Sequence, residues 1–151
     1  EFKNVGYTPP KADKPVYKSL DLEIKPKEAL AIMGSIGSGK STAAKLLVRL
    51  QKHQTGDIII NGVSVTDLDI DDLRKHIVYV PQHPILFNRT LWENISYGLN
   101  GSITRDDVYD LLKKYNLTDL EVVFKDRMDR EVGKLGSSLS GGQRQVVWLI
   151  R

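Results

Sequence analysis

The chain of 151 residues contains no cysteine and no long apolar run. Without thiols it can form neither a disulfide bond nor a thiolate metal site, which fits a reducing compartment. Its longest uninterrupted apolar runs are ALAIM at 29–33 and VVWLI at 146–150, whereas a membrane-spanning helix needs about 20 residues. No N-terminal stretch resembles a secretion signal. These absences exclude a disulfide scaffold and a membrane span within these residues.

A strong excess of one charge is also missing. Lysine and arginine total 22 against 19 acidic residues, for a net charge of +3. This excess is too small and too dispersed to indicate a nucleic-acid partner, and we expect none. The length suggests one domain or a large part of one. The chain opens on EFKNV and closes on VVWLIR, which is typical of the middle of an apolar helix, so we expect both ends to be cut.

The first half of the chain has the patterns of strands, and the second half those of helices. Alternating or short apolar segments predict strands at 1–5, 16–24, 29–33 and 77–80, and a hairpin at 57–65 that turns at Asn61-Gly62. An acidic start predicts a short helix at 69–76, where the negative charges of Asp69, Asp71 and Asp72 would interact favourably with the positive end of the helix dipole. Further helices are expected after polar caps at Thr90, Thr104 and Thr118.

Three glycines crowd into a single junction between an expected strand and an expected helix. Residues 34–41, GSIGSGKS, fit the pattern G-x-x-x-x-G-K-[ST], whose backbone N–H groups can surround a phosphate. The predicted binding residues are Gly34, Ser35, Ile36, Gly37, Ser38, Gly39, Lys40, Ser41 and Thr42. Lys40 would neutralise the β- and γ-phosphates, Ser41 would ligate Mg²⁺ and Thr42 could contact the α-phosphate. A flexible loop with a chance lysine is the alternative, and the flanking elements argue against it.

A second candidate for anion binding lies about 100 residues later. Residues 139–145 read LSGGQRQ, and Ser140-Gly141-Gly142 stand before an expected helix, where backbone N–H groups can face an anion. Taken alone, the same letters are also compatible with a glycine turn in a surface loop. Two phosphate cradles for one nucleotide require an explanation.

Together these motifs resemble the nucleotide-binding domain of ATP-binding-cassette (ABC) proteins, and the likeness covers essentially the whole chain. The resemblance implies an α/β fold: a P-loop NTPase core, an N-terminal antiparallel β layer and a helical insertion carrying the signature LSGGQ. The C-terminal part of the core is expected to be missing. We expect one partial domain over 1–151, divided into 1–65, 66–89, 90–142 and 143–151.

The resemblance also implies roles for residues outside the loop. In the family two domains meet head to tail, so Ser140, Gly141, Gly142 and Gln143 would contact the nucleotide of a second copy or a relative. Gln82 matches the family's Q-loop and would bind Mg²⁺ and order the attacking water, which an amide can do without adding charge. An aromatic ring stacks on adenine in the family; here Tyr7 is favoured and Tyr17 is the alternative.

TLWENISYG at 90–98 and EVGKLGSSLSGGQ at 131–143 look like exporter-type cassettes. By that resemblance, residues 82–98 and Glu131-Val132-Gly133 should face a transmembrane domain of the same polypeptide. TLWENI could equally be an ordinary amphipathic helix start. The implied location is the cytoplasmic face of a membrane, reached through the absent transmembrane domain, with the fragment itself soluble.

The implied activity is ATP hydrolysis coupled to export, with ATP and Mg²⁺ as cofactors. The Walker B aspartate, the general-base glutamate and the switch histidine would follow Arg151, so we expect no sustained turnover from these residues alone. The alternatives are a cassette that binds ATP without hydrolysing it and a soluble cassette that is not a transporter. The transported substrate is not indicated.

Overall fold

The computed structural model describes residues 1–99 and 101–151, which form two compact units, Glu1–Tyr79 and Val80–Arg151. Each unit has its own hydrophobic core. Within the described residues, no helix combines the length and the apolar character needed to cross a bilayer.

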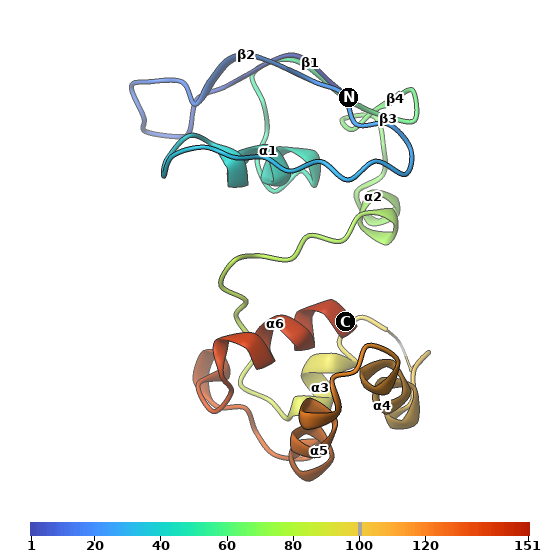
Figure 1. The fold of residues 1–151 in the computed structure, drawn as a ribbon. Helices are drawn as coiled ribbons and strands as arrows, with labels where there is room; N and C mark the ends of the chain where they lie inside the picture. The colour runs from blue at the N-terminus through green and yellow to red at the C-terminus, as the bar shows by residue number, and fades with distance from the viewer. Residues whose placement is uncertain (100) are drawn as a thin grey trace. The chain divides into compact units, whose positions relative to one another are not determined.

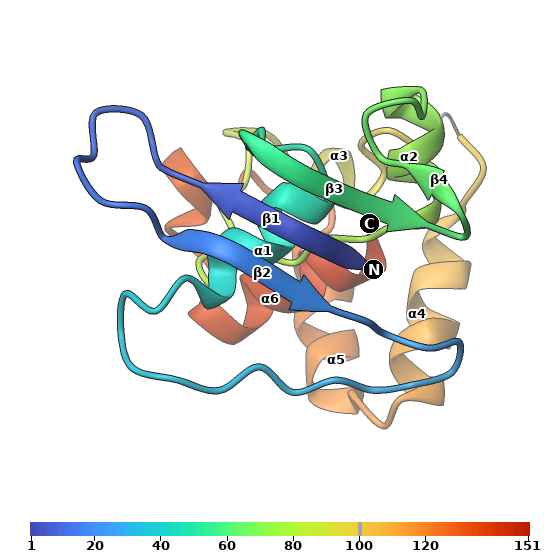
Figure 2. The ribbon, with the colours of Figure 1, turned by 90° about the horizontal axis from the view of Figure 1, so that it is seen from above.

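The first unit is built on an antiparallel sheet (Figure 2). Its strands are β1 (Phe2–Tyr7), β2 (Tyr17–Leu22), β3 (Thr55–Ile60) and β4 (Val63–Ser64), in the order β2-β1-β3-β4. Between β3 and β4, Asn61 and Gly62 have φ values of 49° and 85°, as a two-residue hairpin requires. The predicted antiparallel layer and the Asn61-Gly62 hairpin are therefore confirmed.

Helix α1 (Lys40–Leu47) covers one face of this sheet (Figure 1). Ala43 and Leu46 of the helix are buried in one cluster with Phe2, Val5 and Ile58 from the strands. The helix begins at Lys40, as predicted, and its buried side chains pack with those of β1 and β3.

Helix α2 (Ile70–His76) follows the hairpin. The Asp69 carboxylate caps it by accepting hydrogen bonds from the backbone N–H groups of Asp71 at 2.9 Å and Asp72 at 3.2 Å. The acidic start of this helix was predicted, and these bonds confirm it.

Two predicted strands are not formed. In the segment 29–33 Leu30, Ile32 and Met33 are exposed, and in 77–80 Val78 is 75% exposed. A strand is stabilised by hydrogen bonds to a neighbouring strand, and the described part of the chain places no strand beside either segment. The prediction of buried strands here was wrong for that reason.

The second unit is helical (Figure 1). It contains α3 (Leu91–Ile95), α4 (Arg105–Lys114), α5 (Thr118–Arg127), a 3₁₀ turn η1 (Lys134–Gly136) and α6 (Gly141–Ile150). The four α-helices contribute to one core, whose fully buried members include Ile95, Leu112, Phe124 and Val147.

The helix caps of this unit were predicted in two cases of three. Thr90 and Thr104 each form a capping box with the acidic residue three positions on. Thr118 was wrong, because it is the first residue inside α5 and Leu117 is its N-cap. The Leu117 N–H bonds the Leu112 carbonyl at 2.8 Å, so the chain passes from α4 into α5 without a polar cap.

Candidate functional site

The glycine loop at 34–39 adopts a backbone that side chains disfavour. Gly34, Gly37 and Gly39 have φ values of 155°, 83° and 96°, in the region where an L-residue is strained. A Cβ on Gly39 would lie 2.5 Å from Val16 Cγ1 and 2.8 Å from the Tyr17 hydroxyl. The loop therefore needs glycine at its junction with α1 for conformation and for space.

The Lys40 ammonium lies against the loop that precedes it. It donates to the carbonyl oxygens of Gly34 at 2.8 Å and Ser35 at 2.7 Å, with Ser38 Oγ 3.4 Å away. All three acceptors are uncharged, and phosphate oxygens in their place would form the stronger, charge-assisted kind of bond. The loop thus holds a positive charge where the motif predicts a phosphate.

The start of α1 is also suited to an anion. Its N-cap Gly39 makes no side-chain cap bond, and its first turn has no acidic residue, so the positive end of the helix dipole is not neutralised locally. A hollow of about 180 Å³ is lined by Val16, Gly37, Gly39, Lys40, Ser41 and Thr42. Ser41 is exposed, so its hydroxyl is accessible to a metal bound with the phosphates.

The two candidate aromatic residues are placed differently. Tyr7 is only 3% exposed and belongs to the core under the sheet, so it offers no ring face to a base. This burial argues against our prediction that Tyr7 stacks on adenine; Tyr7 lies in the same buried cluster as Val5, two positions before it in β1. Tyr17, its cross-strand partner, is half-buried and donates its hydroxyl proton to the Gly39 carbonyl at 2.6 Å.

Gln82 is exposed and lies in the second unit. Two bonds tie its segment to the helix that carries the signature. Gln145 Nε2 donates to the Gln82 carbonyl at 3.5 Å, and Trp148 Nε1 donates to the Ile85 carbonyl at 3.2 Å. The structure thus joins the Gln82 segment to α6, and the role of Gln82 toward Mg²⁺ stays a prediction.

The signature residues form the start of α6. Ser140 Oγ accepts from the Gln143 N–H at 3.2 Å, and Gln143 Oε1 accepts from the Ser140 N–H at 2.9 Å. This capping box satisfies two of the free groups at the helix end. Gly141 and Gly142 are exposed, and a Cβ on Gly142 would meet no atom within 4 Å. A ligand could therefore approach their backbone closely.

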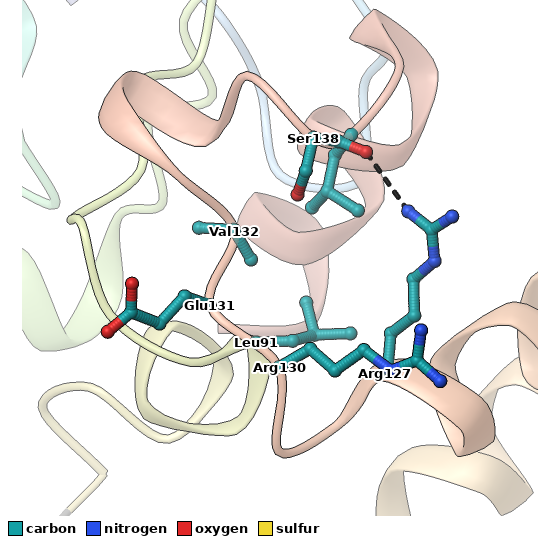
Figure 3. Close-up of a pocket in the computed structure, with 7 residues that line it drawn as sticks. Leu91, Arg127, Arg130, Glu131, Val132 and Ser138 are labelled. Atoms are coloured by element: carbon teal, nitrogen blue, oxygen red, sulfur yellow. Dashed lines mark hydrogen bonds between the residues drawn. The ribbon is translucent and has the colours of Figure 1, made fainter.

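A hollow of about 200 Å³ lies behind the signature (Figure 3). Its walls include the buried side chains of Leu91, Val132 and Leu139. Arg127 Nη1 donates to the Ser138 carbonyl at 3.0 Å. This bond connects α5 to the backbone just before the signature and helps to hold it in place.

The two segments expected to face a transmembrane domain are adjacent in the second unit. Thr90 and Glu131 form an antiparallel bridge. It is flanked by bonds from the Leu91 N–H to the Arg130 carbonyl and from the Val132 N–H to the Arg89 carbonyl, each 3.0 Å long. The two exporter-like segments, 90–98 and 131–143, are therefore joined through their backbones into one continuous surface.

Asn94, a residue of α3, is a polar group beside these segments that sequence reasoning missed. It is fully buried; its Oδ1 accepts from the Phe87 N–H at 2.8 Å, and its Nδ2 donates to the carbonyls of Phe87 and Thr90. An asparagine next to apolar Ile95 in LWENI was the available signal, because a buried amide needs partners.

Comparison with known proteins gives consistent matches. The family model described as "ABC transporter" matches residues 17–151. The chain is 35% identical over 150 residues to the "ATP-dependent lipid A-core flippase" of Chromobacterium violaceum, covering 99% of this chain and 26% of that protein. It is 34% identical to the "Uncharacterized ABC transporter ATP-binding protein YfiB" of Bacillus subtilis, and this match covers 100% of this chain and 26% of that protein.

A solved structure described as a bacterial Atm1-family ABC exporter with ATP bound matches with a TM-score of 0.87 and 34% identity. The match covers 99% of this chain and 26% of that one. The chain therefore spans about a quarter of the length of these relatives, and the predicted α/β fold of the nucleotide-binding domain is confirmed.

Proposed function

The chain belongs to the ABC transporter family, and on this basis we propose that it is the ATP-binding and ATP-hydrolysing domain of an exporter. The observation that carries the proposal is the Lys40 ammonium, held by the carbonyls of Gly34 and Ser35 at the uncapped start of α1. This arrangement suits the phosphates of a nucleotide. The relative solved with ATP bound supports the choice of ATP.

The residues proposed to bind the nucleotide then have different tasks. Lys40 exchanges its carbonyl partners for phosphate oxygens and stabilises charge on the β- and γ-phosphates. The positive φ values of Gly37 and Gly39 let the backbone approach those oxygens. Ser41, which is exposed beside Lys40, and Gln82 would hold Mg²⁺, which neutralises phosphate charge when bound. Thr42, one position further into α1, would contact the α-phosphate.

The signature serves a second copy in this proposal. Ser140, Gly141, Gly142 and Gln143 would contact the γ-phosphate of a nucleotide held by the loop of a facing domain. Support comes from the exposed, side-chain-free start of α6, which the Ser140–Gln143 capping box and the Arg127–Ser138 bond hold in shape. No acidic residue lies in its first turn, so an anion meets no local repulsion.

The partner in the same polypeptide is proposed to be a transmembrane domain, which would place this domain at the cytoplasmic face of a membrane. The relatives named as a flippase and an exporter support this. The joined surface around Thr90 and Glu131 is the proposed contact. Our expectation that the 151 residues alone do not sustain turnover stays a prediction.

The direct test is ATP hydrolysis by the full-length protein. We expect Lys40→Ala to lower turnover at least about 100-fold, because a charge-assisted phosphate contact made in the transition state is lost. Lys45→Ala is the matched control: it removes a lysine from the last turn of the same helix, outside the loop, and should leave turnover nearly unchanged. Full activity of Lys40→Ala would refute the proposed role of the loop.

A further inference from the structure

We propose that Tyr17 is a positioning residue for nucleotide binding, acting through the backbone of Gly39. The inference rests on the proposed function and deepens it: the affinity for the triphosphate depends on a hydroxyl group supplied by the sheet, outside the glycine loop. Tyr17 lies in β2, 22 positions before Gly39, and its hydroxyl donates to the Gly39 carbonyl at 2.6 Å.

The Gly39 carbonyl is an unusually crowded acceptor. Besides the Tyr17 hydroxyl, it receives the N–H groups of Thr42 at 2.6 Å and Ala43 at 3.2 Å. The two backbone bonds belong to the first turn of α1, whereas the Tyr17 bond comes from the sheet. Tyr17 therefore ties the junction between loop and helix to strand β2 of the sheet.

This tie also sets the direction of a phosphate-facing group. A peptide unit is planar and trans, so the Gly39 carbonyl and the Lys40 N–H point in opposite directions within one plane. Holding the carbonyl toward Tyr17 and the helix turns the Lys40 N–H toward the loop, where the first N–H groups of a helix are free for an anion. The hydroxyl bond thus pre-orients a backbone donor without touching the nucleotide.

The surroundings keep Tyr17 in place and protonated. A Cβ on Gly39 would lie only 3.0 Å from Tyr17 Cζ, so the ring packs directly on the glycine. Burial raises the pKa of the Tyr17 phenol, with the nearby Ala43 N–H acting in the opposite direction. The phenol is therefore a neutral donor throughout the physiological pH range. Tyr17 pairs across the strands with Tyr7, whose ring is buried in the core.

The test compares Tyr17→Phe with Tyr7→Phe, which removes the same atom from the paired tyrosine. Calorimetric titration of the full chain with Mg·ATP and with Mg·GTP measures affinity, and thermal unfolding without nucleotide measures stability. We expect Tyr17→Phe to lower the affinity for both nucleotides about fivefold, which corresponds to the loss of one typical hydrogen bond. Its melting temperature should match that of Tyr7→Phe. Equal loss for ATP and GTP is expected because the effect passes through the phosphates.

Unchanged affinity of Tyr17→Phe would overturn the inference. A lower affinity of Tyr17→Phe together with a clearly lower melting temperature than that of Tyr7→Phe would also overturn it, since the hydroxyl would then stabilise the fold as a whole. A loss confined to ATP would overturn it too, because it would place Tyr17 at the base. Wild-type protein that binds neither nucleotide would refute the proposed function itself, which separates the two failures.

Discussion

Gly39 occupies a position where the chain has no room for a side chain. Its φ of 96° costs an L-residue about 1–2 kcal/mol, and an added Cβ would collide with Val16 Cγ1 at 2.5 Å. We therefore expect Gly39→Ala to lower the free energy of unfolding by more than about 2 kcal/mol and to abolish nucleotide binding. Urea unfolding and Mg·ATP titration measure the two effects.

Gly37→Ala is the control for this change. Gly37 also has a positive φ, 83°, but a Cβ there would meet no atom within 4 Å. It should carry only the conformational cost, about 1–2 kcal/mol. Equal stability losses in the two variants would show that the contact with Val16 and Tyr17 does not matter.

Single residues also show where sequence reasoning stopped. The pattern at 34–41 was enough to select Lys40, because its spacing alone places the lysine at the loop. It could not select Tyr17, whose relation to Gly39 depends on how β2 and α1 pack. Tyr7 was preferred from its position in the sequence, and the packing of β1 against α1 buries it instead.

The capping boxes of the second unit make its helices sensitive to acid. The Thr90 backbone N–H and then its hydroxyl lower the pKa of Glu93; the Thr104 hydroxyl and then its backbone N–H lower the pKa of Asp107. A carboxyl with a folded-state pKa below its unfolded value stabilises the fold above the unfolded pKa, about 4. That stability is lost as the pH falls through the folded pKa.

We therefore expect the melting temperature of the protein to fall between about pH 5 and pH 2, with part of the fall due to these two groups. Glu93→Gln and Asp107→Asn keep an acceptor at each cap but remove its titration. Circular dichroism melts across this range should give a flatter pH dependence for the double variant than for wild type. Parallel curves would show that the caps contribute nothing to the acid sensitivity.

The sequence predicted those helices and strands whose structure depends on residues close together in the chain. It did not predict those that depend on a distant partner. Thr90, Thr104 and Asp69 cap helices through hydrogen bonds to residues only two or three positions further on, and the sequence displays such short spacings. The segments 29–33 and 77–80 have suitable composition for strands, but pairing requires a partner distant in the chain. The described residues provide none, and apolar composition alone does not form a strand.

The two motifs proposed to bind the nucleotide lie in different units of the chain. The loop with Lys40 belongs to Glu1–Tyr79, and the signature with Ser140 belongs to Val80–Arg151. The sequence could predict both motifs, because each is continuous and its chemistry is local. It could not show how a copy of one meets a copy of the other, since that depends on surfaces assembled from many segments.

The proposal that two copies share each nucleotide can be tested by mixing two inactive variants of the full-length protein. Lys40→Ala removes the loop's cation, and Ser140→Arg blocks the start of α6. Each variant alone should be inactive. In a mixed pair, one site would combine both defects and the other would have an intact loop facing an intact signature. We expect a mixture of the two single variants to regain ATP hydrolysis after dissociation and reassembly. A mixture of wild type and the Lys40→Ala/Ser140→Arg double variant should show only the activity of its pairs of wild-type copies. Failure of the mixed single variants to regain activity, in pairs shown to have assembled, would contradict a nucleotide held between Lys40 of one copy and Ser140 of another.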